Sequence, residues 1–286
     1  MLKRFKKEYI ALLILIIFVI GILFVYFYKP QTNIMKVAFI DVGQGDSIFI
    51  QAPNGVQMLV DGGRGGKVLS ELSRLMPFGD KSIDIVIGTH PDADHIGGLV
   101  SVLENYEVEN FVEPGAISNS KIYNTLENKI EEKKIKHILG RAGQRIILDN
   151  EKNIYFEILF PNQNVQNWET NDASIVGKLV YGESSVMLSG DSPISKELYL
   201  VNNKRADLDV DILKLGHHGS RTSSSIQFLQ ETSPEMTIIS AGRDNSYGHP
   251  HKEVVDKLSA LHIPYLATYK EGTIICTSDA IKILCK

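Results

Sequence analysis

The distribution of apolar residues divides the chain into a short amino-terminal segment and a long remainder. Residues 11–28, ALLILIIFVIGILFVYFY, form an unbroken apolar run with no polar face. A helix needs about 20 apolar residues to cross a bilayer, so this run predicts a transmembrane helix. We therefore expect residues 1–33 to form a basic cytoplasmic tail, an anchor and a linker, and residues 34–286 to form one domain.

Beyond the linker, short apolar runs bounded by turn residues predict strands, and longer stretches with helical spacing predict helices. A hairpin is expected to close the chain. This succession of strands and helices predicts two packed sheets with helices outside them. Strands are expected at 35–40, 47–51, 57–60, 83–88, 154–160, 174–181, 184–188, 210–215 and 237–240, and helices at 97–105, 121–136, 194–201, 223–231 and 253–261.

The two cysteines of the chain, Cys276 and Cys285, lie in the terminal hairpin. We expect residues 277–280 to form its turn, which pairs Cys276 with Ile281 and displaces Cys285 by about 13 Å along the strand. That separation exceeds the roughly 7 Å limit between the Cα atoms of a disulfide. Two unpaired cysteines are therefore expected, and they give no information about the compartment of the protein.

Charge is distributed unevenly between the two segments. Residues 1–29 contain five basic residues and one acidic residue, a balance of +4, and the whole chain carries −4, so the remainder carries −8. Basic residues before an apolar run place the amino terminus in the cytoplasm and the following domain outside. A cleaved signal peptide is the alternative, but no Ala-x-Ala site follows the run. An acidic domain is a poor general ligand for nucleic acid, which binds through lysine and arginine.

Histidines are concentrated at three places, each just after a predicted strand. In the first, Asp92 and Asp94 lie between two histidines. Two carboxylates and two imidazoles this close together are typical of a metal site, because a divalent cation coordinates neutral nitrogen and anionic oxygen together. The alternative is an aspartate-rich helix start in which the histidines are incidental. Six of the eight histidines form the three pairs His90 and His95, His217 and His218, and His249 and His251.

Further short motifs accompany these pairs in a fixed order: Asp61-Gly62-Gly63 precedes the first pair, and Gly190-Asp191 precedes the second. The ordered set resembles the metallo-β-lactamase superfamily. Segments 39–47, 171–174, 217–220 and 247–250 resemble the hydrolase-like domain of ComEC-type competence proteins. The resemblance covers residues 35–286 and implies an α/β fold, the αββα sandwich of that superfamily, with metal ions at one edge.

The resemblance also implies one or two divalent ions, Mn²⁺ or Zn²⁺, with Asp191 as a bridging ligand. Asp92 stands where the superfamily usually has a histidine, and Asn171 or Asp172 replaces the histidine that usually precedes Gly190-Asp191. Oxygen ligands are harder than imidazole and favour Mn²⁺. The first ion is expected at His90, Asp92 and either Asn171 or Asp172, and the second at Asp94, His95, Asp191 and one of His217 and His218, with His218 preferred.

Other residues are expected to act around the ions. Asp61 is expected to orient the first cluster by accepting a hydrogen bond, with a simple turn role as the alternative. Lys214, Arg221 and Arg243 are candidates for charge stabilisation, or for ordinary solvated surface positions. The expected catalytic residues are Asp94, His217 and His249, and the expected substrate-binding residues are Asp46, Arg221 and His251.

The expected function is metal-assisted hydrolysis of a phosphodiester by a protein of the cell membrane, anchored through residues 11–28 with its carboxy-terminal domain outside. The resemblance to competence proteins implies a nuclease that acts on DNA. One alternative is a phosphodiesterase of the cell wall, like the teichoic-acid esterases of the same superfamily. Another is a domain without activity that binds a metal or a partner at the cell surface.

Overall fold

The computed structural model describes residues 9–10, 12–21, 33–203 and 208–286. The chain divides into two compact units, Met1–Thr32 and Asn33–Lys286. In the first unit, residues 12–21 are helical and their large apolar side chains are exposed. No helix among the described residues is both long enough and apolar enough to span a membrane. The anchor expected at 11–28 lies partly outside the described residues, at residue 11 and residues 22–28.

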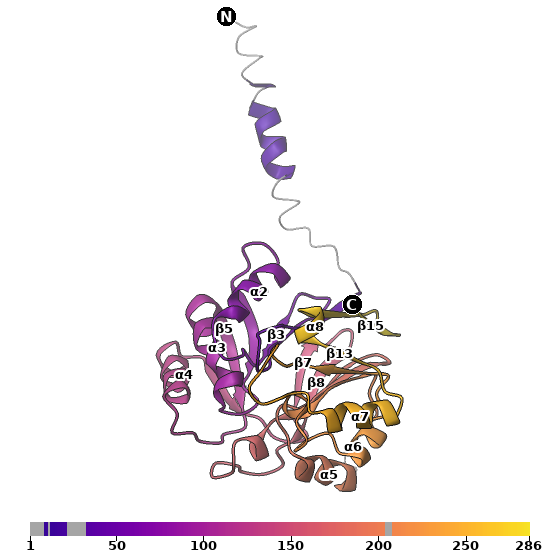
Figure 1. The fold of residues 1–286 in the computed structure, drawn as a ribbon. Helices are drawn as coiled ribbons and strands as arrows, with labels where there is room; N and C mark the ends of the chain where they lie inside the picture. The colour runs from indigo at the N-terminus through magenta and orange to yellow at the C-terminus, as the bar shows by residue number, and fades with distance from the viewer. Residues whose placement is uncertain (1–8, 11, 22–32, 204–207) are drawn as a thin grey trace, which may run out of the picture. The chain divides into compact units, whose positions relative to one another are not determined.

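The second unit is built on two mixed sheets (Figure 1). In the order β15-β14-β1-β2-β3-β4-β5-β6 and β13-β12-β11-β10-β9-β8-β7, each strand is hydrogen-bonded to its neighbours. The first sheet contains β1 (Met35–Phe39), β2 (Ile48–Gln51), β3 (Gln57–Val60), β4 (Ser82–Ile87), β5 (Glu107–Glu113), β6 (Lys136–Leu139), β14 (Ile274–Ser278) and β15 (Ile283–Cys285). The second contains β7 (Arg145–Asp149), β8 (Ile154–Phe160), β9 (Val176–Tyr181), β10 (Ser184–Leu188), β11 (Ile212–Lys214), β12 (Met236–Ile239) and β13 (Tyr265–Ala267).

Helices cover the outer face of each sheet, which completes the αββα sandwich (Figure 1). On β1, Val37 and Phe39 belong to the core between the sheets, whereas Ala38 packs in the cluster beneath the helices. Successive side chains point to opposite faces of a strand, so a strand buried on both faces needs apolar residues throughout. The first sheet is covered by α2 (Lys67–Leu75), α3 (Ala93–Asn105) and α4 (Lys121–Glu132), and the second by α5 (Ile194–Asn203), α6 (Ile226–Thr232) and α7 (Lys252–Ala260). The short helix α8 (Thr268–Glu271) follows β13.

The strand directions bring the histidine-bearing segments to one edge of the sandwich. Strands β3 and β4 run parallel in the first sheet, and β10, β11 and β12 run parallel in the second. The loops after these strands therefore leave from the carboxyl ends of the strands, which is where α/β folds place their ligands. These loops carry Asp61, His90, Asp191, His218 and Ser240.

Several elements differ from the sequence-based expectations. The helix expected at 121–136 ends at Glu132, because Lys134 takes a positive φ of 54° and Ile135 returns into the core beneath the helices. Residues 136–139 then form β6 at the edge of the first sheet, beside β5. Helix α2 and strands β5, β6, β7 and β13 were not expected from the pattern of apolar residues.

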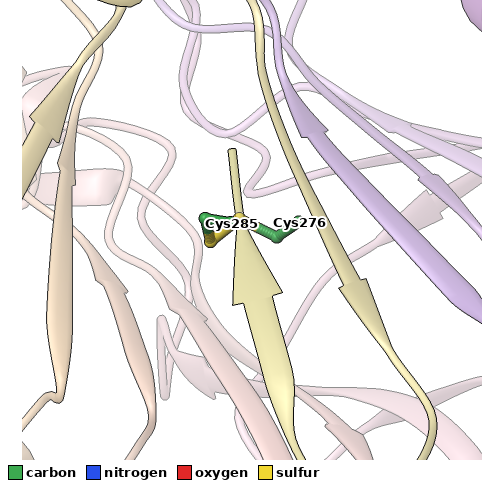
Figure 2. Close-up of a disulfide and its surroundings, with 2 residues drawn as sticks. All are labelled: Cys276 and Cys285. Carbon is green, nitrogen blue, oxygen red and sulfur yellow. A yellow bond between two sulfur atoms is a disulfide. The ribbon is translucent and has the colours of Figure 1, made fainter.

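The expectation of two unpaired cysteines is wrong: Cys276 and Cys285 form a disulfide across β14 and β15 (Figure 2). The turn occupies Asp279–Lys282, two residues later than expected, because Oδ1 of Asp279 accepts hydrogen bonds from the backbone amides of Ile281 and Lys282. Strand β14 therefore continues through Ser278, and the register places Cys276 directly opposite Cys285. Their Cα atoms lie 4.0 Å apart, in place of the displacement of about 13 Å expected from the sequence.

Candidate metal centre

The first histidine pair lies at the start of α3. Helix α3 begins at Ala93, so Asp94 and His95 belong to its first turn, and Asp92 is its N-cap. The Asp92 side chain accepts no capping hydrogen bond, and its Oδ2 atom lies 3.6 Å from Nε2 of His90. The carboxylate therefore faces the histidine, which an ordinary helix start does not require.

Two glycines allow this helix start to lie close to its neighbours. A Cβ atom on Gly98 would lie 2.0 Å from the carbonyl oxygen of Gly62, in the turn that carries Asp61. A Cβ atom on Gly45 would lie 2.0 Å from the carbonyl oxygen of Asp94. Because only glycine lacks a Cβ, these two positions bring the Asp46 loop and the Asp61 turn against the first two turns of α3.

Asp61 lies behind the first cluster and fixes its orientation. Its Oδ1 accepts a hydrogen bond from the Thr89 amide at 2.8 Å, and its Oδ2 accepts one from the Thr89 hydroxyl at 2.7 Å. The same Oδ2 lies 2.8 Å from Nδ1 of His95, and both side chains are fully buried. A carboxylate at Nδ1 places the imidazole proton there, which leaves Nε2 of His95 free as a lone-pair donor.

Asp191 is the centre of the site. It follows β10, is 3% exposed, and its carboxylate faces Nε2 of four histidines. Its Oδ1 lies 3.3 Å from His95, and its Oδ2 lies 3.9 Å from His90, 3.7 Å from His217 and 3.5 Å from His218. The backbone amide of Asp191 donates to the Ser174 hydroxyl at 3.2 Å, which ties the loop after β10 to the loop before β9.

The second histidine pair is presented by strained backbone. His217 and His218 have φ of 49° and 56°, in the left-handed region that non-glycine residues rarely adopt. Such strain is found where a site requires it, and here it turns both imidazoles toward Asp191. Nδ1 of His218 contacts the carbonyl oxygen of Ser240 at 2.9 Å, and Nε2 lies 3.5 Å from Oδ2 of Asp94.

Several buried polar atoms of the expected ligand residues form no hydrogen bond. They are Nε2 of His90, His95 and His218, Oδ1 of Asp191 and Oδ1 of Asn171. Buried polar atoms without partners are costly, and a set of imidazole nitrogens with carboxylate and amide oxygens fits divalent cations. The donor set therefore fits the metal ions that the resemblance implies.

Electrostatics supports the same conclusion. Burial lowers the pKa of His90 to about 3, so this ring is neutral, as a metal ligand must be. Burial alone would raise the pKa of Asp191, but the charges of His218 and His95 hold it well below its usual range. For His218 the effect of burial is outweighed by Asp191 and Asp46, which raise its pKa to about 9. The cluster thus attracts additional positive charge, as protons or as a cation.

Asn171 and Asp172 have different surroundings, although the sequence left the choice between them open. Both lie in the short helix η1 (Asn171–Ala173). The Asp172 carboxylate pairs with the Lys196 ammonium at 3.3 Å, and that ammonium also lies over the Trp168 ring. Asn171 keeps a buried, unpartnered Oδ1 between two residues that contact the centre, since Thr170 hydrogen-bonds Asp92 and Ser174 accepts from Asp191. Asn171 is therefore the better candidate ligand.

Asp46 and Lys214 lie behind the histidines. Asp46 is 1% exposed and Lys214 is 0% exposed, and the Lys214 ammonium donates to Oδ2 of Asp46. This burial excludes the surface position considered for Lys214. The Asp46 carboxylate contacts Lys214 and His218, and the substrate contact expected of Asp46 stays a prediction. Arg243 is likewise engaged elsewhere, because its guanidinium donates to the Tyr269 carbonyl oxygen at 3.1 Å.

The third histidine pair lies beside His217 of the second pair. The His249 ring centroid lies 5.4 Å from that of His217 and 4.9 Å from that of His251. Tyr247 is 54% exposed, and its ring lies nearly parallel to His249 at 5.7 Å. Nδ1 of His251 accepts from the backbone amide of Arg221 at 3.1 Å, while the Arg221 side chain faces solvent.

A family model for the metallo-β-lactamase superfamily matches residues 40–243. The chain belongs to the metallo-β-lactamase superfamily. Two solved structures share its fold. Igni18, a metallo hydrolase from Ignicoccus hospitalis, aligns with a TM-score of 0.55 at 14% identity over 85% of this chain and 98% of that one. The metallo-β-lactamase fold protein YhfI from Bacillus subtilis aligns with a TM-score of 0.52 at 13% identity over 82% and 96% of the two chains.

Three proteins whose sequences are similar to this chain are competence proteins or their relatives. The chain is 33% identical to ComE operon protein 3 of Bacillus subtilis, over 87% of this chain and 34% of that protein. It is 30% identical to competence protein ComA of Neisseria gonorrhoeae, over 86% and 33%, and 31% identical to recombination protein 2 of Haemophilus influenzae, over 86% and 29%. The chain thus spans about a third of the length of these relatives.

A second group of ligand-type residues lies away from the superfamily's metal centre, on the outer face of the first sheet. Glu113, Glu127 and His137 offer ligand atoms within 4.8 Å of one another. Here the charges already compensate one another, because Nε2 of His137 lies 3.2 Å from Oε1 of Glu113. Burial and the charge of Glu113 raise the pKa of Glu127, so a proton can satisfy the second carboxylate.

Proposed function

We propose that this superfamily member is a metal-dependent phosphodiesterase that cleaves DNA outside the cytoplasm. The proposal is carried by the unpartnered buried atoms around Asp191, which belong to a donor set that fits divalent ions. These atoms lie at the carboxyl ends of the strands, beside the partly exposed side chains of Asp92 and His217. A site of this kind is accessible to substrate, whereas a structural metal site would be closed.

The residues divide into two ligand groups that share Asp191. His90, Asp92 and Asn171 would hold one ion, and Asp94, His95 and His218 would hold the other. A divalent ion held there would lower the pKa of a bound water and would polarise a phosphoryl oxygen. Asp61 orients His95 through Nδ1, and the Ser240 carbonyl oxygen orients His218 in the same way.

His217 is positioned to transfer a proton beside the ligand groups, next to Asp191. Its side chain is 25% exposed, its Nδ1 is held by the Thr222 hydroxyl at 3.1 Å, and its Nε2 faces Asp191. Burial lowers the pKa of His217, so the ring is neutral near pH 7 and its free nitrogen can accept a proton. Burial, together with the charges of His218 and His217, also lowers the pKa of His249, to about 4.

DNA is the substrate that the relatives favour, because their names refer to competence and recombination. The domain carries a net charge of −8 outside residues 1–29, so counterion release at phosphates cannot supply most of the affinity. Base stacking does not depend on charge, and it is worth about 1–3 kcal/mol per base on an aromatic side chain. Tyr247 and His249 present such a surface beside the metal centre.

A phosphodiester of the cell wall is the second candidate, and the acidic balance of the domain favours it. A teichoic-acid unit that carries choline is less negative than DNA, and its quaternary ammonium would fit the exposed face of Tyr247. The choice between the candidates therefore depends on what Tyr247 contacts.

We propose that the domain lies outside the cell membrane and that residues 11–28 anchor it. The basic residues before the apolar run favour this topology. The disulfide between Cys276 and Cys285 also supports it, because disulfides persist in oxidising compartments and are rare in the cytosol. Protease added to cells without a wall should then digest the domain, and full protection would contradict this topology.

The function is tested with the full chain in detergent, stripped of metal and reloaded with Mn²⁺ or Zn²⁺. We expect cleavage of linear DNA with more activity in Mn²⁺ than in Zn²⁺, because Asp92 and Asn171 contribute hard oxygen ligands. Hydrolysis of glycerophosphocholine without cleavage of DNA would favour the cell-wall candidate. A protein that holds metal but is inert on both substrates would be a surface-binding domain instead.

A further inference from the structure

The Lys214 side chain enters the core at a position where packing alone favours an aliphatic residue. Lys214 is the last residue of β11 and pairs in register with Leu188 and Ile238, which both belong to the core between the sheets. Its neighbour on the same face, Ile212, belongs to that core as well. An ammonium buried there requires a compensating partner, since an unpaired buried charge is strongly destabilising.

The partner is Asp46, in the loop between β1 and β2. The Lys214 ammonium donates to Oδ2 of Asp46 and, at 3.2 Å, to the carbonyl oxygen of Gly190, the residue before Asp191. The backbone of Asp46 is held as firmly, because its carbonyl oxygen accepts from the Gly63 amide at 2.8 Å. The ion pair thus joins the loops after β1 and β10 to the end of β11, behind the metal centre.

Asp46 lies close enough to coordinate an ion at this centre, but its carboxylate faces the Nδ1 atoms of the histidines and not their Nε2 atoms. Its carboxylate belongs to the group of oxygen and nitrogen atoms that lie within 4.8 Å of one another, with His95, Asp191 and His218. However, Oδ1 of Asp46 lies 3.3 Å from Nδ1 of His218, and Oδ2 lies 3.9 Å from Nδ1 of His95. The Nε2 atoms of both rings face Asp191 instead.

Charge balance gives Lys214 a second role. Two divalent ions and one ammonium supply five positive charges, which match the negative charges of the carboxylates gathered in this part of the described structure. Without the ammonium, one buried carboxylate lacks a counter-charge and is close enough to coordinate an ion itself. The carboxylates are those of Asp46, Asp61, Asp92, Asp94 and Asp191.

We propose that Lys214 and Asp46 form a positioning pair, in which Lys214 keeps the Asp46 carboxylate out of the metal coordination and holds it as an anion behind His95 and His218. This inference rests on the metal binding proposed above. An anion behind a ligand histidine makes the imidazole a better donor, and loss of such an outer partner typically lowers metal affinity or activity about 10–100-fold.

The test uses the full chain in detergent with Co²⁺ as the probe ion, because the visible spectrum of Co²⁺ reports the number and type of its ligands. In Lys214→Met, the released Asp46 carboxylate should add an oxygen ligand and change the spectrum, and turnover per bound ion should fall at least about tenfold. In the double variant Lys214→Met/Asp46→Asn the competing carboxylate is absent, so the spectrum should return to that of the wild type while turnover stays low. Lys178→Met is the matched control and should change neither, because this half-buried lysine of β9 donates to the Asp209 carbonyl oxygen away from the centre.

The outcomes separate this inference from the proposed function. If both Lys214 variants lose thermal stability but keep the wild-type spectrum and turnover per bound ion, the pair is structural and the inference is overturned. If Lys214→Met alone does not fold, the double variant decides, because it contains no unpaired buried charge. Wild-type turnover in that variant overturns the inference alone, whereas a wild-type protein that binds no Co²⁺ overturns the proposed function with it.

Discussion

The substitution Asp61→Asn should lower metal affinity by changing the tautomer of His95, a candidate ligand that the substitution leaves in place. In the wild type, Oδ2 of Asp61 lies 2.8 Å from Nδ1 of His95, which therefore carries the proton. An asparagine can keep the bond from the Thr89 amide with its oxygen, and its NH₂ group then faces both the Thr89 hydroxyl and His95. A donor at Nδ1 drives the imidazole proton to Nε2, the atom that faces Asp191.

The expected loss follows from that geometry. His95 would cease to be a ligand of the second ion, while the first ligand group stays complete, so one of two ions should bind about 10–100-fold more weakly. That range corresponds to about 1.4–2.8 kcal/mol. The thermal stability of the metal-free protein should change much less than in Asp61→Ala, which leaves the buried Thr89 amide without its acceptor and leaves the Thr89 hydroxyl only Nδ1 of His90, at 3.0 Å.

Isothermal titration of the stripped protein with Mn²⁺ measures this prediction. Asp211→Asn is the matched control, because Oδ2 of Asp211 accepts from the Ser185 amide at 2.6 Å and from its hydroxyl at 3.2 Å, as Asp61 does from Thr89. The control should bind Mn²⁺ as the wild type does. Two ions bound with unchanged affinity in Asp61→Asn would refute the reasoning.

Three further predictions follow from other parts of the molecule. Tyr247→Ala should raise the KM for single-stranded DNA about tenfold or more without changing the KM for an abasic strand, because only the former has bases to stack. Tyr247→Phe should behave as wild type, and equal effects of Tyr247→Ala on both strands would argue against stacking. Cys276→Ser should lower the thermal stability of the non-reduced protein, and reduction should lower the wild type alone to about the same melting temperature; a wild type insensitive to reduction would argue against the disulfide. The hydrogen bond with Glu113 raises the pKa of His137 above 6.5, so its contribution to folding is present below pH 6.5 and is lost as the pH rises through the raised value. The free energy of unfolding in urea should therefore fall between pH 6 and pH 9 by roughly 0.5 kcal/mol more in the wild type than in His137→Gln, a small difference because the pair is partly exposed. An equal fall in both proteins would count against the pair.

The fold was predictable because its strands are apolar on both faces, as on β1, where neighbouring residues enter different cores. The end of α4 was not predictable from periodicity, since Ile135 and Ile138 continue the apolar spacing although the backbone turns at Lys134. The hairpin register depended on which four residues form the turn, and the side-chain bonds of Asp279 decide this only in the folded chain.

The candidate site was predictable as a set of loops but not as a set of atoms. Strand ends with histidine and aspartate indicated which loops meet, and the structure brings His90, His95, Asp191 and His218 together. The partner of a side chain in another segment cannot be read from the sequence, so the pairing of Asp172 in η1 with Lys196 in α5 could not be foreseen. The one available signal for Lys214 was its place within an apolar strand, which indicates burial and not a surface charge.

The measurement that tests the central claim most directly is the metal content and DNA turnover of Asp191→Ala beside the wild type, both stripped and reloaded with Mn²⁺. Asp191 follows a strand end and faces four histidines, so its loss should remove bound metal and lower turnover at least about 100-fold, with a much smaller effect on the melting temperature of the metal-free protein. Wild-type turnover in Asp191→Ala would contradict the account.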